Sequence, residues 1–276
     1  MKNKKVIITS VAVAVFIIVV GVILWYVNIK RPYDLAVKDY NTAVDIINNK
    51  NAELDEAINK LQGLIDSAEK PLDNTIIDTS KEVIKSANTT KTLVDEMPQK
   101  TDDIIARTAE LSKPVDYSET LKQLNDTYNA FDISIKQYKQ LTNPSEDFVI
   151  QRLQTIDEVA YVQAVTEDND PNGKLNKEGG YTATVYFESK NVNQSNVYGT
   201  TLLEKCTDAG GAVEVYANEE DAIKRDNYLA VFDGGIFSSG SHKVVGTIIV
   251  RTSNELTATQ QKALEEKVIS ALSELK

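Results

Sequence analysis

The sequence has almost no cysteine or histidine: Cys206 and His242 are each the single residue of their type among 276. One cysteine cannot form an intrachain disulfide, which suits an oxidising compartment and a reducing one alike. No phosphate-binding loop, His-Glu-x-x-His or Gly-x-Ser-x-Gly motif occurs either. These absences favour a binding or structural protein over an enzyme.

Basic residues are scarce after the first 31 positions. Residues 1–31 carry five basic and no acidic side chains, whereas residues 32–144 and 145–276 carry net charges of −7 and −9. Nucleic acids are bound by lysines and arginines that neutralise their phosphates. We therefore expect no nucleic-acid partner.

Glycine is rare in the first half. Between Val22 and Asn172 the single glycine is Gly63, and ten of the twelve glycines follow from Gly173 onward. A glycine-poor stretch is typical of helices, and a glycine-rich one is typical of strands joined by turns. We predict three parts: a cytoplasmic tip and transmembrane anchor in residues 1–31, a helical stalk in 32–143 and an α+β head in 144–276.

One long uncharged run dominates the N-terminal part. Val6–Val27 contains 22 residues without a charge, enough for a helix to cross a bilayer core of ~30 Å. The alternative is a buried core helix. The run exceeds a signal-peptide core and lacks a small-residue cleavage site, so we expect an uncleaved single-pass anchor in the cell membrane. The preceding lysines favour a cytoplasmic N-terminus and extracellular C-terminal domains.

The predicted stalk shows helical periodicity interrupted by prolines. Apolar residues recur at steps of three and four, which places them along one face of each helix. We predict helices at about 33–68, 72–97, 101–112 and 117–142, since helices end before prolines or carry them in the first turn. These helices should pack as an elongated antiparallel bundle or coiled coil.

The predicted head mixes strands and helices. Strands are expected at 159–166, 181–188, 211–216 and 244–250, where β-branched and aromatic residues concentrate. Ser145, Asn218 and a Thr257–Gln260 capping box should each begin a helix, while residues 192–206 stay open between loop and helix. The order predicts a small α+β sandwich with a four-stranded, mostly antiparallel sheet covered on one face.

The loop Glu167–Gly180 concentrates polar residues. Asp168, Asp170 and Asn172 followed by Gly173 match the first half of a calcium loop, in which alternate oxygens converge on the cation. The second half departs from that pattern, because Gly179 occupies the twelfth position. The alternative is an Asx turn in a solvated acidic loop. Calcium is the single cofactor hypothesis that the sequence supports.

Other candidates for chemistry are isolated. A catalytic His242 or Cys206 needs partners assembled in space, and the Ser67-x-x-Lys70 pattern lacks the companion motifs of acyl-transferring enzymes. Aromatic residues of the head could form a binding face or belong to the core, and both interpretations stay open. These residues are Tyr181, Tyr186, Phe187, Tyr198 and Tyr216.

Several segments of the head carry a resemblance. They are Thr166–Gly173, Gly179–Tyr181, Val213–Ala222 with Arg225 and Tyr228–Leu229, and Val244–Arg251. In these segments the head resembles the C-terminal module of short membrane-anchored proteins of Gram-positive bacteria labelled Ebh-like, or extracellular-matrix-binding-like. The resemblance implies a bacterial cell surface and an extracellular-matrix or cell-wall partner. It implies no catalytic or ligand-binding residues.

Together these features predict a non-catalytic, membrane-anchored surface protein that presents a small binding domain on a helical stalk. One alternative is an accessory subunit of a membrane complex, in which the anchor and stalk contact a membrane-protein partner. Another is an envelope enzyme.

Overall fold

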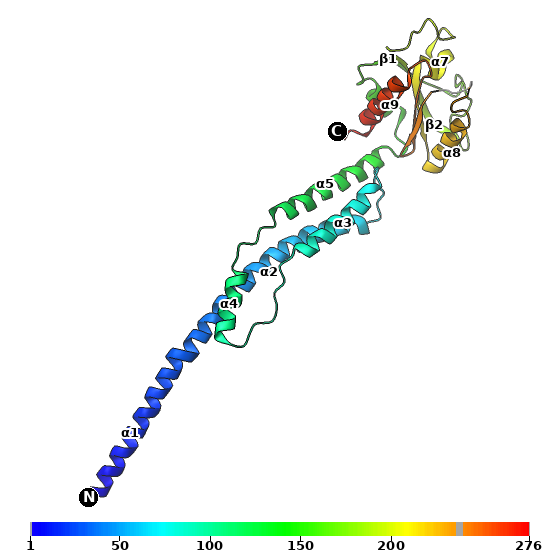
Figure 1. Ribbon diagram of the computed structural model, residues 1–276. Coiled ribbons are helices and arrows are strands. Elements are labelled where there is room, and N and C mark those ends of the chain that lie inside the picture. Colours follow the sequence, from blue (N-terminus) through cyan, green and yellow to red (C-terminus); the bar gives the residue numbers. More distant parts are fainter. Residues whose placement is uncertain (1, 236–239, 276) are drawn as a thin grey trace. The chain divides into compact units, whose positions relative to one another are not determined.

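The computed structural model describes residues 2–235 and 240–275 and contains both α-helices and a β-sheet (Figure 1). The chain divides into two compact units. Unit 1 comprises Met1–Asp66 and Asp78–Tyr128, and unit 2 comprises Ser67–Ile77 and Asn129–Lys276.

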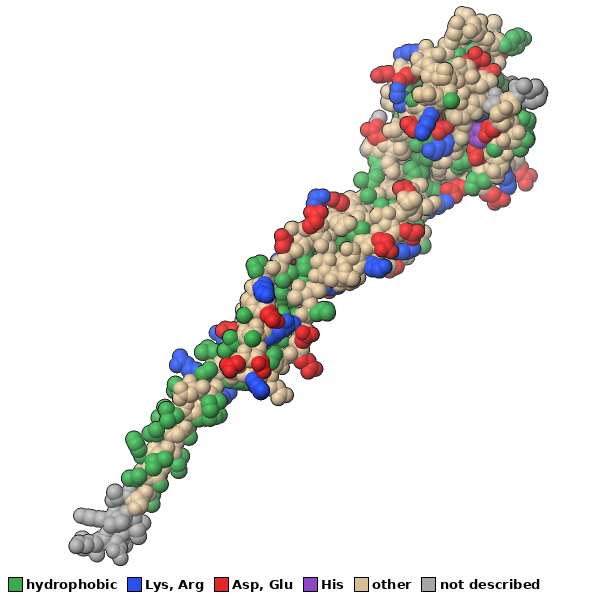
Figure 2. Space-filling model, viewed as in Figure 1, with side chains coloured by type: hydrophobic (Ala, Val, Ile, Leu, Met, Phe, Trp, Pro, Cys, Tyr) green, Lys and Arg blue, Asp and Glu red, His purple; other side chains and the backbone are tan. Residues whose placement is uncertain are grey.

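Unit 1 begins with the apolar helix α1, Lys2–Trp25. All but one of its described side chains are exposed, including Phe16, Ile17 and Ile18, which are 68%, 64% and 65% accessible, and Figure 2 shows apolar side chains along this helix. In water each such side chain forgoes ~1.5–3 kcal/mol of burial. Among the described residues, the helix that contains this segment is long and apolar enough to cross a membrane.

The helix does not end at Pro32, where the sequence led us to expect a break. A π-helical segment, Tyr26–Lys30, leads directly into α2, Arg31–Asp66. The Arg31 N–H donates to the Tyr26 carbonyl, five residues earlier. Proline lacks an N–H, and a local π segment can accommodate such an irregularity without ending the helix. The backbone is therefore helical from Lys2 to Asp66.

Three further helices follow: α3 at Thr75–Thr90, α4 at Thr101–Leu111 and α5 at Ser118–Gln140. The expected helices at 101–112 and 117–142 are confirmed, but the one expected at 72–97 stops at Thr90. The following backbone is held by side chains instead, since Asn51 Nδ2 donates to the Thr92 carbonyl at 2.9 Å. Tyr40 Oη likewise donates to the Asp95 carbonyl at 3.0 Å.

Helices α2 and α4 share an apolar cluster in unit 1. Val94, whose spacing suggested a continued helix, packs against this cluster from the non-helical segment. The buried members are Ala36, Tyr40, Ala43, Ile104 and Leu111. The coiled coil and the full bundle stay predictions.

Unit 2 contains a five-stranded sheet, so the expected number of four is wrong. The strands are β1 Val159–Ala164, β2 Tyr181–Ser189, β3 Gly210–Tyr216, β4 His242–Val245 and β5 Ile248–Thr252. Their order is β1-β2-β3-β5-β4, and every pair is antiparallel.

The extra strand arises because the apolar run 244–250, which we expected to form one strand, contains a turn between β4 and β5. Gly246 has φ +62°, and with Thr247 it forms the two-residue turn between β4 and β5. A Cβ on Gly246 would lie 2.7 Å from the Leu141 carbonyl oxygen. Glycine meets both the positive φ and the close approach at this turn.

The sheet is covered on both faces, not on one as expected. On the first, the Val213 face, Val185, Val213 and Val250 pack with helices α6 (Glu146–Leu153) and α9 (Ala258–Ser273). On the second, the Glu214 face, Tyr186 and Ile249 pack with α7 (Leu202–Lys205), η2 (Cys206–Ala209) and α8 (Glu219–Ala230). Two covered faces explain why every residue of β3 and β5 is buried.

The predicted helix starts in unit 2 are confirmed. Ser145 and Asn218 accept hydrogen bonds from the first-turn amides of α6 and α8. Thr257 forms a reciprocal capping box with Gln260 at the start of α9. The ambiguous segment 192–206 contains the short helix α7, which begins with a capping box of its own. Side-chain caps of this kind satisfy backbone amides that a helix leaves unpaired.

Candidate functional site

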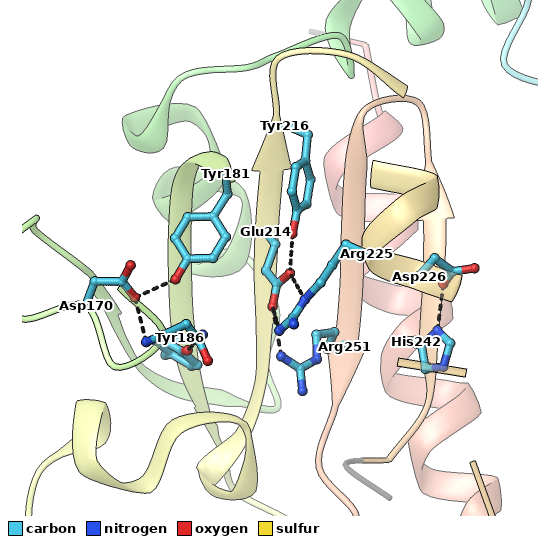
Figure 3. A network of polar contacts seen from close by, with 10 residues as sticks. Asp170, Tyr181, Tyr186, Glu214, Tyr216, Arg225, Asp226, His242 and Arg251 are labelled. Atoms are coloured by element: carbon cyan, nitrogen blue, oxygen red, sulfur yellow. Dashed lines mark hydrogen bonds and ion pairs between the residues drawn. The ribbon is translucent and has the colours of Figure 1, made fainter. Parts of the chain in front are cut away.

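The Glu214 face carries a buried ionic cluster. In β3, Val213 and Val215 point to one face, so Glu214 points to the other. The strand register brings Arg251 of β5 close to it, and α8 supplies Arg225 (Figure 3). Glu214 is fully buried.

Four hydrogen bonds satisfy the Glu214 carboxylate. Oε2 accepts from Arg225 Nε at 3.0 Å and from Tyr216 Oη at 2.8 Å. Oε1 accepts from Arg225 Nη2 at 3.2 Å and from Arg251 Nη1 at 2.8 Å. Burial by itself raises the pKa of Glu214, but the charges of Arg251 and Arg225 outweigh it and hold the pKa below its usual value. The cluster therefore stays ionised and fixes both guanidinium groups.

The loop between β1 and β2 is organised around Asp170. Oδ1 accepts from Tyr181 Oη at 2.5 Å and from the Asn172 amide at 3.0 Å, while Oδ2 accepts from the Lys174 and Leu175 amides. Burial raises the pKa of Asp170, but these hydrogen bonds outweigh it and hold the pKa low. The carboxylate thus fixes the conformation of its own loop through these hydrogen bonds.

The side chains predicted to bind calcium are either exposed or already hydrogen-bonded to other groups of the chain. Asp170 engages both oxygens with donors of the chain, and the Asn172 side-chain amide donates to Tyr186 Oη at 3.2 Å. Asp168 is exposed. Within residues 2–235 and 240–275, no group of three His, Cys, Asp or Glu side chains is placed to hold a metal ion. Calcium binding by this loop stays a prediction.

Three cavities adjoin the same loop. The largest, about 850 Å³, is lined by Asn169, Pro171, Tyr198 and Cys206 among others. A cavity of about 330 Å³ shares Cys206 with it. A third, of about 430 Å³, shares three residues with the second: Asn172, Arg225 and Tyr228. The Glu167–Gly180 loop, α8 and several aromatic side chains therefore converge on one concave region of unit 2.

The two smaller cavities have a basic and aromatic lining. Lys174, Lys224 and Arg225 line the 430 Å³ cavity, and Arg225 and Arg251 line the 330 Å³ cavity. No acidic side chain is among the described residues that line either one. The charged side chains that line these two cavities are therefore all basic, although Glu214, Glu220 and Asp221 behind them balance part of that charge.

The five aromatic candidates divide into two groups. Tyr198 is 94% exposed at the largest cavity, and the other four are buried. Phe187 lies on the Val213 face. Burial raises the pKa of Tyr186 and Tyr216 far above the usual value, so both hydroxyls stay protonated. The buried tyrosines are parts of the core whose hydroxyl groups contact Glu214, Asp170 or Asn172.

His242 and the serine beside it have different hydrogen-bond partners. His242 lies between Asp226, 2.6 Å from Nδ1, and Asp233, 3.3 Å from Nε2. Its neighbour Ser241 instead bonds Thr252 and Glu265. Ser238 and Ser239, the other serines of this turn, lie outside the described residues.

Cys206 and Ser67 also lack the surroundings of a nucleophile. Burial raises the pKa of the Cys206 thiol, and its Sγ donates to the Leu203 carbonyl. A thiol is a weak nucleophile until it ionises. Ser67 accepts from the Glu69 amide, while the ammonium of Lys70 pairs with Glu219.

Sequence reasoning missed part of the site. Lys224 was not singled out at all, and Arg225, Tyr228 and Arg251 entered only as part of the resemblance, not as binding residues. The available signal was Glu214, a charged residue between Val213 and Val215 in an otherwise apolar strand. A charge in such a position needs buried partners.

The fold and the site define an α+β protein with one N-terminal helix long and apolar enough to cross a membrane, and with a concave basic site in unit 2. No protein-family model, curated protein or solved structure significantly matches this chain.

Proposed function

We propose that the protein is a single-pass, membrane-anchored surface protein whose unit 2 binds a ligand without transforming it. The ligand would enter the concave region beside α8 and the Glu167–Gly180 loop. Its source would be the cell wall or the extracellular matrix, in line with the resemblance of the head.

The concave region is the observation that carries this proposal. Its floor is held by the four hydrogen bonds to Glu214, and one wall is held by the hydrogen bonds to Asp170. Binding sites gain affinity when their polar groups are already held in place. Each candidate nucleophile, by contrast, is engaged or protonated, which favours binding over catalysis.

The anchor supports the proposed location. Exposed apolar side chains cover the described part of α1, and a bilayer would bury them. The flanking basic residues favour a cytoplasmic N-terminus, with unit 2 on the outside.

Protease treatment of intact cells tests the location. The chain would carry one epitope tag at each end. We expect the C-terminal tag to be lost from intact cells and the N-terminal tag to be lost after lysis alone. Loss of the N-terminal tag from intact cells, with the C-terminal tag protected, would reverse the topology and refute the proposal. Release of a shortened chain into the medium would refute the uncleaved anchor.

A further inference from the structure

We infer that the Arg225 cavities bind a carboxylated sugar, a ligand of the uronic acid type, with its carboxylate on the free edge of the Arg225 guanidinium. This inference rests on the proposed binding role of the same site. It names the chemical class that the site would recognise.

Arg225 is held with part of its guanidinium unused. Nε and Nη2 donate to Glu214, and within the described chain Nη1 has no hydrogen-bond partner. The side chain is 20% exposed, and it lines both smaller cavities. A guanidinium has five N–H groups in a planar fork, so the edge that remains can hold a carboxylate through two parallel hydrogen bonds.

The surroundings of Arg225 favour an anion. Lys174 and Lys224 line the same cavity, and its described lining contains no carboxylate. Lys224 also pairs with Glu220 at 2.9 Å and with Asp221 at 3.4 Å, which reduces the attraction of Lys224 for a ligand anion. Lys174 is exposed, and among the described residues it forms no such ion pair. Charges near a half-buried guanidinium act through a lower dielectric than in water, so they attract an anion more strongly.

A carboxylate fits this site better than a phosphate does. Phosphate sites commonly use a helix N-terminus or successive backbone amides. The N-terminus of α8 is instead occupied by Asn218 and followed by Glu219, Glu220 and Asp221. The site therefore offers the planar edge of an arginine without the backbone cradle that a phosphate prefers.

The rest of the lining suits a polar ring. Tyr228 is 56% exposed, and its ring centre lies 5.4 Å from the Arg225 guanidinium carbon. An exposed aromatic face can cover a sugar ring, and Asn172 offers an amide to its hydroxyls. Volumes of about 430 and 330 Å³ are near the lower end for ligand pockets, which favours one or two rings over an extended peptide.

Titration of the full chain in detergent micelles with glucuronate tests the inference. Glucose provides the same ring without a carboxylate, inorganic phosphate provides a different anion, and triglutamate provides an acidic peptide. We expect saturable heat with glucuronate, none with glucose and weaker binding of the other two anions. Arg225→Gln should weaken glucuronate binding ~10–100-fold, because it removes charge-assisted hydrogen bonds.

Matched variants separate recognition from folding. If circular dichroism shows that Arg225→Gln is unfolded, Tyr228→Ala tests the inference in its place. We expect Tyr228→Ala to weaken glucuronate binding about two- to tenfold. Tyr161→Ala removes a tyrosine of similar exposure outside these cavities and should leave binding unchanged. Lys262→Gln on α9 is the corresponding control for charge.

Several results would overturn the inference. They are the absence of glucuronate binding, tighter binding of phosphate or triglutamate, and unchanged affinity in folded Arg225→Gln or Tyr228→Ala. The tag experiment is independent of any ligand, so a correct topology without glucuronate binding would refute this inference alone. Reversed topology would refute the proposed location even if glucuronate binds in micelles.

Discussion

Replacing Glu214 with glutamine gives the most direct test of the buried cluster. The side chains have nearly the same shape, but the amide nitrogen is a donor. At either oxygen position it would face a guanidinium group, which can only donate: Arg225 at one, Arg225 and Arg251 at the other. No rotation of the amide relieves this conflict. The two guanidinium groups would also lose their shared counter-charge.

The expected cost follows from burial. Removing one partner of a buried ion pair typically costs ~3–5 kcal/mol. We expect Glu214→Gln to lower the free energy of opening of the sheet by that amount. Amide exchange in β3 and β5 should then accelerate on the order of a hundred- to a few-thousand-fold.

Hydrogen–deuterium exchange with mass spectrometry is the suitable assay. The single tryptophan, Trp25, lies in α1, so its fluorescence would report on that helix and not on the sheet. Exposed Glu266→Gln on α9 is the matched control and should leave exchange unchanged. The triple variant Glu214→Leu, Arg225→Met, Arg251→Met should recover part of the loss, because apolar replacements of buried ionic clusters are often tolerated. Acceleration of β3 exchange by Glu214→Gln below about tenfold would refute the reasoning.

Further expected outcomes concern acid stability, the loop and two glycines. The pKa of Glu214 is depressed in the folded state, so its contribution to stability is present above the unfolded value of ~4.3 and is lost as pH falls below it. Hydrogen–deuterium exchange measured at decreasing pH should show this loss of stability in the parent chain and not in Glu214→Gln. Asp170→Ala should increase proteolysis within 167–180 to the same extent with or without millimolar calcium, whereas protection of the parent loop by calcium that Asp170→Ala abolishes would support the metal hypothesis. Gly211→Ala should destabilise unit 2 by ~1–3 kcal/mol in the same exchange assay, since its Cβ would lie 2.4 Å from Phe187 Cζ. Gly63→Ala, with open space in helix α2, should stabilise that helix by up to ~1 kcal/mol.

Local signals predicted the helix starts of unit 2 well. A cap such as Asn218 or Thr257 acts within three residues, so its effect is visible in the sequence itself. The apolar helix α1 is equally local, because length and composition define it. The five-stranded sheet was harder, since Gly246 turns the chain inside a run whose apolar residues continue on both sides.

The site could not be predicted because its members are distant in sequence. Glu214 and Arg251 are separated by 37 positions and meet through strand register. Arg225 reaches them from α8. A periodic pattern shows which residues are buried, but register and helix placement decide which buried charges become neighbours. The loop 167–180 was recognised as unusual, whereas its partners across the concave region were not.

The uninterrupted helix from α1 into α2 has a consequence for how α1 and the α2–α4 cluster are related. Without a break at Pro32, the rotational orientation of α1 about its axis determines the direction in which the apolar face of α2 points. Each residue added to a helix rotates the later residues by ~100° about its axis. One alanine inserted after Asp34 would turn Tyr40 and Ala43 relative to α1, whereas seven would nearly restore their direction. Rotation of α1 about its axis would in this way be transmitted directly to the α2–α4 cluster.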